Sequence, residues 1–60
     1  MKYSVKINQD GESTYLTFGN RASWSYRTAR KHAKEFLVNY GGDITATIED
    51  QFGEAKATLA

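Results

Sequence analysis

Four basic side chains are concentrated in one short segment of this 60-residue chain. The segment is SYRTARKHAKEF, and its cations are Arg27, Arg30, Lys31 and Lys34. On a helix, spacings of three, one and three residues bring such side chains onto the same side of two turns. Clustered guanidinium and ammonium groups bind phosphate or carboxylate oxygens through charge-assisted hydrogen bonds. The chemistry that this segment offers is therefore the binding of an anion.

The distribution of charge along the chain supports this interpretation. Residues 21–40 carry five cations and one acid, and residues 41–60 carry one lysine and four acids, although the net charge is only +1. Such a separation can steer a charged partner onto one face. Like charges on neighbouring helical turns also repel by roughly a few tenths of a kcal/mol per pair. A contact surface is therefore favoured, and a merely solubilising surface is the simplest alternative.

Residue combinations that carry out catalysis or hold a metal are missing from the sequence. His32 is the single histidine and there is no cysteine, so neither a nucleophile–histidine pair nor a zinc ligand set is recognisable. Because cations flank His32, we expect it to be a surface residue. Glu49 and Asp50 are adjacent, so on a strand they would face opposite sides and could not act as an acid–base pair. We expect no enzymatic activity, no cofactor, no metal ion and no small-molecule substrate.

The length and hydropathy of the chain limit its class. Sixty residues form one small domain, residues 1–60, with a modest core. No apolar run approaches the roughly 18 residues that suggest a membrane-spanning helix. The first residues, MKYSVKINQDG, also lack the apolar block of a signal peptide. We therefore expect a cytoplasmic protein with no membrane partner.

Alternating polar and apolar residues predict a hairpin at the start of the chain. Residues 2–8, KYSVKIN, and residues 13–18, STYLTF, each have the period of two that is typical of a half-buried strand. Between them, Asp10-Gly11 favours a tight turn because both residues tolerate a positive φ. In the second strand Tyr15 falls on the outward face. This position makes Tyr15 a candidate for contact with a partner.

A helix is predicted to follow the hairpin. Ser23 or Ser25 can cap its start, since a serine hydroxyl accepts a hydrogen bond from an unpaired backbone N–H. Gly41-Gly42 ends it, because glycine adopts the left-handed conformation at a helix C-terminus. Trp24, next to the helix start, is expected to cover the core. Apolar residues at spacings of three and four form one helical stripe: Tyr26, Ala29, Ala33, Phe36, Leu37 and Tyr40.

A second hairpin completes the predicted fold. Residues 43–50, DITATIED, again alternate between polar and apolar side chains. The following QFG supplies a turn with Gly53 at positive φ. Residues 54–60, EAKATLA, form a weakly hydrophobic strand that is suited to a sheet edge. The order is β-β-α-β-β, which predicts an α+β fold with a four-stranded, mainly antiparallel sheet and one helix packed on one face. The strand order stays open. The predicted core consists of Tyr3, Val5, Ile7, Leu16, Phe18, Ala29, Ala33, Phe36, Leu37, Ile44, Ile48 and Leu59.

Four acids lie in or beside this second hairpin: Asp43, Glu49, Asp50 and Glu54. Acids that flank strands and turns are commonly solvated, and we expect that environment here. An acidic contact patch, or mimicry of a nucleic acid, is the alternative, although mimicry usually needs a strongly negative net charge.

The order of these segments resembles that of a known family. KYSVKI, ESTYLTF, ASWSYRTARKHAKEF and GDITATIEDQFGEAKATLA together are similar to small phage-encoded anti-CRISPR proteins of the type I-F inhibitor class, with Ala29-Arg30-Lys31-His32-Ala33 as the matching helical core. The resemblance implies a non-enzymatic inhibitor that binds a bacterial CRISPR-Cas surveillance complex, a protein assembly with bound RNA, in the cytoplasm of the host cell. It implies docking near the surface where target DNA pairs with guide RNA.

The same resemblance assigns roles to residues. Arg30 and Lys31 become the leading contacts, with Lys34 and Arg27 beside them. The acidic final hairpin and the shorter tail depart from the family pattern.

Two other functions are compatible with the residues. The first is a small DNA- or RNA-binding module or phage regulator, in which the cations bind phosphates and Tyr15 stacks on a base. The second is a structural domain that dimerises through an exposed sheet edge.

Overall fold

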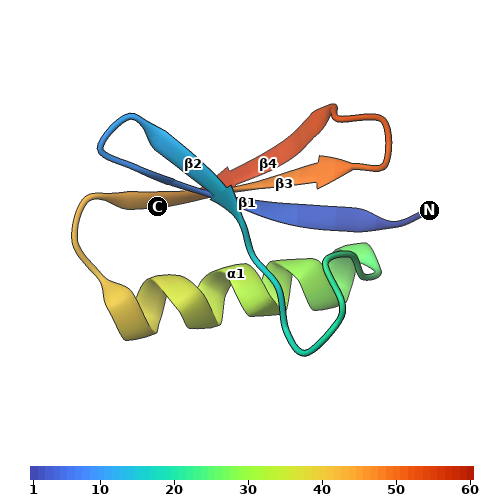
Figure 1. Cartoon of the computed structure of the whole chain (residues 1–60), viewed down its shortest axis with the longest axis horizontal. Helices are drawn as coiled ribbons and strands as arrows, with labels where there is room; N and C mark the ends of the chain where they lie inside the picture. Colours follow the sequence, from blue (N-terminus) through green and yellow to red (C-terminus); the bar gives the residue numbers. More distant parts are fainter.

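The computed structural model describes residues 1–60 and confirms the predicted α+β fold. Its elements are β1 (Tyr3–Gln9), β2 (Glu12–Tyr15), α1 (Tyr26–Tyr40), β3 (Ile44–Asp50) and β4 (Ala55–Leu59). The four strands form one antiparallel sheet in the order β2-β1-β3-β4, and α1 lies across one face of it (Figure 1). The last strand is therefore at a sheet edge, as expected.

The first hairpin is built around a two-residue turn. Asp10 has a φ of 51° and Gly11 a φ of 79°, which is the combination that matches the twist of paired strands. The prediction of residues 13–18 as one strand is wrong beyond Tyr15, because the chain must leave the sheet to reach the helix. Phe18 instead pairs with Arg21 through two backbone hydrogen bonds of 3.0 Å in a small loop.

The helix begins and ends at the residues that the local signals allow. Ser25, not Ser23, is the N-cap, and its side chain accepts a hydrogen bond from the backbone N–H of Thr28 at 3.4 Å. At the other end, the N–H of Gly41, whose φ is 56°, donates to the carbonyl of Leu37 at 2.9 Å. The helix thus runs for 15 residues with both ends satisfied by side-chain or backbone partners.

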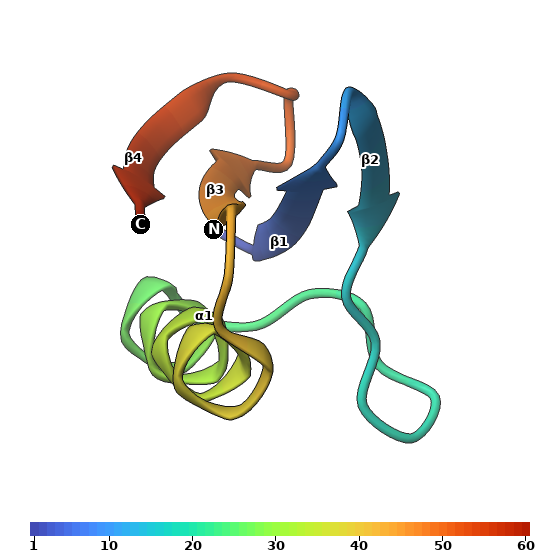
Figure 2. The same cartoon turned by 90° about the vertical axis from the view of Figure 1, so that its left-hand side faces the viewer.

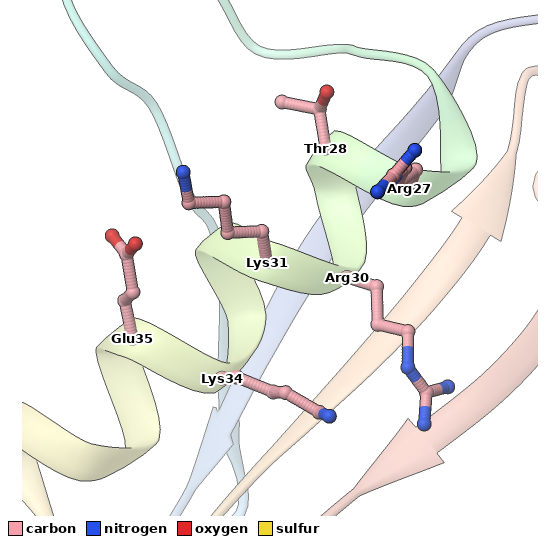
Figure 3. Close-up of a pocket in the computed structure, with 6 residues that line it drawn as sticks. All are labelled: Arg27, Thr28, Arg30, Lys31, Lys34 and Glu35. Atoms are coloured by element: carbon pink, nitrogen blue, oxygen red, sulfur yellow. The ribbon is translucent and has the colours of Figure 1, made fainter.

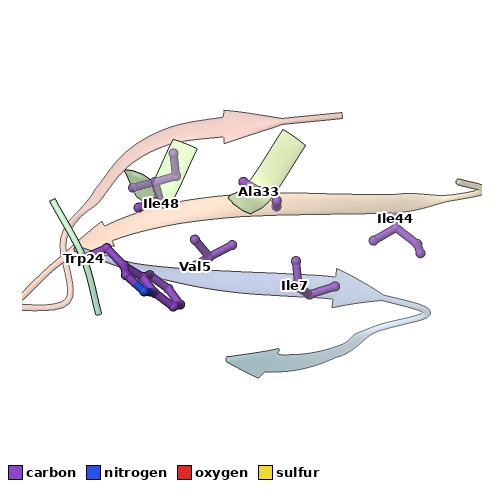
Figure 4. Packing of buried hydrophobic residues seen from close by; sticks show 8 residues of the cluster. Val5, Ile7, Trp24, Ala33, Ile44 and Ile48 are labelled. Atoms are coloured by element: carbon purple, nitrogen blue, oxygen red, sulfur yellow. The ribbon is translucent and has the colours of Figure 1, made fainter. Parts of the chain in front are cut away.

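The core lies between α1 and the two central strands (Figure 4). Its buried apolar residues include the predicted Val5, Ile7, Ala29, Ala33, Ile44 and Ile48, together with Ala46 and Trp24, which were not in the predicted set. Small alanine side chains on the inner side of the helix let it lie close to the sheet. Five other predicted core residues are only partly buried and pack around this cluster: Tyr3, Leu16, Phe36, Leu37 and Leu59.

The prediction that Phe18 belongs to the core is wrong. Its side chain is 45% exposed, because the strand that would have turned it inward ends three residues earlier. The expectation that Trp24 covers the core is confirmed. Its backbone pairs with Tyr3 through hydrogen bonds of 2.7 and 2.8 Å, which extends the pairing of β1 by one bridge and holds the indole against the core.

The two acids at the end of β3 are buried, which corrects the expectation of solvated carboxylates. Glu49 is 8% and Asp50 6% exposed. The carboxylate of Glu49 accepts a hydrogen bond from the Tyr15 hydroxyl at 2.6 Å and lies 3.7 Å from the Lys6 ammonium. That of Asp50 accepts from the backbone N–H groups of Phe52 and Glu54. Burial is tolerated because each carboxylate has several donors.

Asp50 is expected to make the stability of the fold depend on acid pH. The N–H of Glu54 is the main cause that lowers the pKa of its carboxyl, helped by the N–H of Phe52 and by Lys56. The pKa of Asp50 in the folded protein lies below the value of about 4 in the unfolded chain. The ionised carboxylate therefore stabilises the fold fully above about pH 4, and this stabilisation is lost as the pH falls through the folded pKa. Urea unfolding between about pH 6 and pH 2 should therefore show a smaller loss in Asp50→Asn, which keeps an acceptor for the turn. An equal loss in both proteins would contradict this.

Candidate functional site

The packing of α1 fixes where its basic residues point. Ala29 and Ala33 face the sheet and are fully buried, so the opposite side of the helix faces solvent. Arg27, Arg30, Lys31 and Lys34 are exposed on that side, and we call these four residues the basic face. Together with Thr28 and Glu35 they line a shallow depression that contains no hydrophobic residue (Figure 3).

No carboxylate neutralises the basic face. The structure contains three ion pairs, which join Lys6 to Glu49 and Lys56 to Asp50 and Glu54, and none of them involves a cation of the helix. Glu49, Asp50 and Glu54, three of the four acids in the last third of the chain, are thus paired with lysines outside the helix. The four cations of the basic face therefore have no ion-pair partner within the chain and are available to an external anion.

The four cations divide between the two flanks of the helix. Figure 3 shows the side chains of Arg30 and Lys34 extending together to one side, while Lys31 extends to the other, the side of Glu35. Lys34 also borders a small groove with Leu59 at the end of β4, so the Arg30–Lys34 flank is the one beside that strand. The structure therefore brings Arg30 together with Lys34 and separates it from Lys31, its partner in the sequence resemblance.

The charge of the basic face opposes the helix dipole. The first turn of α1 contains no acid and the last turn no base, whereas a helix is stabilised by the reverse arrangement, at about 0.3–1 kcal/mol per charge. Arg27 is the second residue of the helix, where the partial charge of the N-terminus is positive. The same partial charge would favour an anion bound nearby. The arrangement thus lowers the stability of the free helix and suits an anionic partner.

Reversing the charge of Arg27 is expected to stabilise the fold. Arg27→Glu places a carboxylate in the first helical turn and should raise the free energy of unfolding by about 1 kcal/mol, with Arg27→Gln about halfway between. Urea unfolding at low ionic strength measures the difference. Lower stability of Arg27→Glu than of the wild type would show that the arginine has a structural role.

Tyr15 lies on a different surface from the basic face. It pairs with Lys6 of β1, whose neighbours Val5 and Ile7 are buried beneath the helix, so Tyr15 is on the outer side of the sheet. Its side chain is 50% exposed, as expected. Its hydroxyl, however, is engaged by Glu49, and this hydrogen bond is the main cause that raises the pKa of the phenol. Tyr15 and the basic face therefore cannot contact one small ligand together.

Sequence reasoning missed an aromatic cluster around His32. The imidazole stacks on Phe18 with ring centroids 4.4 Å apart and meets the Trp24 ring edgewise at 4.8 Å. Its Nδ1 atom is buried without a hydrogen-bond partner, so the expectation of a surface histidine is wrong. The signal available was that position 32 borders the apolar stripe, four residues before Phe36.

This aromatic cluster holds the loop that precedes α1 against the helix. The loop of residues 16–25 runs along one side of α1, and Figure 2 shows it hanging below the sheet on the side of β2. The ring of Phe18, in this loop, stacks on His32 of the helix. On the other side, towards β4, no such loop accompanies the helix. The flank that carries Arg30 and Lys34 is thus the more open one.

The titratable side chains of the chain assemble no metal centre. No group of three or more His, Asp or Glu side chains is placed to hold a metal ion. No helix of the chain is long and apolar enough to cross a bilayer. Comparison with models of protein families, with curated proteins and with solved structures gave no match.

Proposed function

We propose that this protein is a non-enzymatic inhibitor that docks through its basic face on a CRISPR surveillance complex and blocks the binding of target DNA. The observation that carries the proposal is the group of four exposed cations on α1, none of which has a carboxylate partner within the chain. The resemblance of the sequence to type I-F inhibitors supplies the identity of the partner.

The physical basis of the inhibition is steric and electrostatic. A surveillance complex exposes a polyanionic RNA and a channel that must accept DNA. A charged helix lowers the energy of approach to such a surface and speeds association at low salt. A folded domain with principal extents of 30 × 21 × 18 Å, once bound there, excludes a DNA strand from the site that it covers. No chemical step is needed.

The proposal is tested by competition with target DNA. A purified type I surveillance complex is incubated with the protein before labelled target DNA is added, and the bound DNA is measured by mobility shift. We expect the bound fraction to fall as the protein concentration rises. The same DNA occupancy with and without a large excess of the protein would refute the proposal.

A further inference from the structure

One flank of the basic face has a uniform charge. By the helical turn of about 100° per residue, Arg27, Arg30 and Lys34 fall within a sector of about 60° that contains no acid. Figure 3 shows Lys31 extending instead to the flank of Glu35. From residue 27 to residue 34 the row advances by about seven helical steps, or about 10 Å along the helix axis. It therefore presents three positive charges in a line to one elongated anion.

The lining of this surface favours phosphate over an acidic protein as the ligand. Tight protein interfaces are anchored by aromatic or aliphatic side chains in desolvated pockets. The depression between the cations has no hydrophobic lining, and the apolar groove formed by Leu37, Val38 and Leu59 meets the basic face only at Lys34. Contacts to a nucleic acid backbone are made by Arg, Lys and hydroxyl side chains. The composition matches a backbone-binding surface that is independent of base sequence.

The position of Glu35 favours a single nucleic acid strand over a duplex as the ligand. A duplex groove would bring phosphates to both flanks of the helix, and on the Lys31 flank they would meet this carboxylate. A single strand can follow the β4 side of the helix alone, where the loop of residues 16–25 does not intrude. The positive partial charge of the helix N-terminus, near Arg27, adds to the attraction.

We propose that the row Arg27–Arg30–Lys34 binds the sugar–phosphate backbone of a single nucleic acid strand. The inference rests on the proposed function in naming which component of the partner the basic face contacts. Lys31, although adjacent in sequence to Arg30, lies outside the contact.

The test compares two lysines that differ only in their flank. Binding of a fluorescein-labelled oligouridylate to the wild type, Lys34→Glu and Lys31→Glu is followed by fluorescence anisotropy at several salt concentrations. Both variants change the net charge equally, and both residues are exposed. With three phosphate contacts, log K for the wild type should fall with log salt with a slope of about −2. Lys34→Glu should bind about tenfold more weakly with a slope smaller by about 0.7, and Lys31→Glu less than about threefold more weakly.

Other outcomes would overturn the inference. These are equal losses in the two variants, no binding of the oligouridylate at low salt, tighter binding of duplex DNA than of the single strand, or displacement of the strand by polyglutamate at equal charge concentration. The result is separable from that of the DNA competition. Inhibition of the complex without binding of free RNA removes only this inference, whereas binding of free RNA without inhibition removes only the proposed function.

Discussion

Replacing Ile48 with alanine is expected to lower the free energy of unfolding by about 2–5 kcal/mol. Ile48 is the largest fully buried side chain, followed by Val5, and the two residues pair across β1 and β3 in the centre of the sheet. The truncation removes apolar contacts and leaves a cavity that a small, close-packed core cannot fill. A domain of 60 residues typically has a free energy of unfolding of about 3–9 kcal/mol, so this substitution removes a large part of it.

The control for this variant is Val38→Ala. Val38 is also an aliphatic residue, but its side chain is 83% exposed on the helix, so its truncation should change stability by less than about 0.5 kcal/mol. Urea or thermal unfolding followed by circular dichroism measures both. If Ile48→Ala unfolds at the same midpoint as Val38→Ala, the helix-on-sheet core is incorrect, and so is the orientation of the basic face that depends on it.

The second large effect is expected from reversing charge on the open flank. The double variant Arg30→Glu/Lys34→Glu should bind the surveillance complex at least about a hundredfold more weakly, because two charge-assisted hydrogen bonds, each with a net value of about 1.5–3 kcal/mol, are replaced by repulsion. Both side chains are exposed and lack partners within the chain. The far-UV circular dichroism spectrum should therefore match that of the wild type.

A matched control separates position from net charge. Lys2→Glu/Arg21→Glu changes the total charge by the same amount, and both residues are exposed outside the helix. This control should bind within about threefold of the wild type, since neither residue belongs to the basic face and exposed charges outside the contact are screened by salt. Equal loss of binding in the two double variants would mean that overall charge, and not the basic face, determines docking.

Local patterns were sufficient to predict most of the architecture. The turn at Asp10-Gly11, the helix end at Gly41 and the inward alanines of α1 depend on residues close together in sequence. The helical period likewise places the four cations outside once the apolar stripe is inside. These features need no knowledge of which segments meet in space.

The features that were missed depend on distant partners. Burial of Glu49 requires the hydroxyl of Tyr15, 34 residues away in the chain. His32 is covered only because the loop carries Phe18 back to the helix. Strand order follows from the pairing of β1 with β3, which no local pattern specifies.

The candidate site was predicted only in part for the same reason. Helical phase groups the cations on one face, but the direction of each long side chain depends on its flank. Arg30 and Lys31 are neighbours in sequence, yet about 100° apart around the helix axis. Helical phase therefore already separates them and pairs Arg30 with Lys34, four residues apart. Which flank faces the loop of residues 16–25 and which faces β4 is known only from the fold (Figure 2).

The most direct measurement of the central claim is the affinity of the wild-type protein for a purified surveillance complex as a function of salt. If the unpaired cations of α1 make the contact, log K should fall linearly with log salt with a slope steeper than about −2, a loss of more than about tenfold between about 50 and 200 mM. An affinity that stays constant across that range would contradict docking through the basic face.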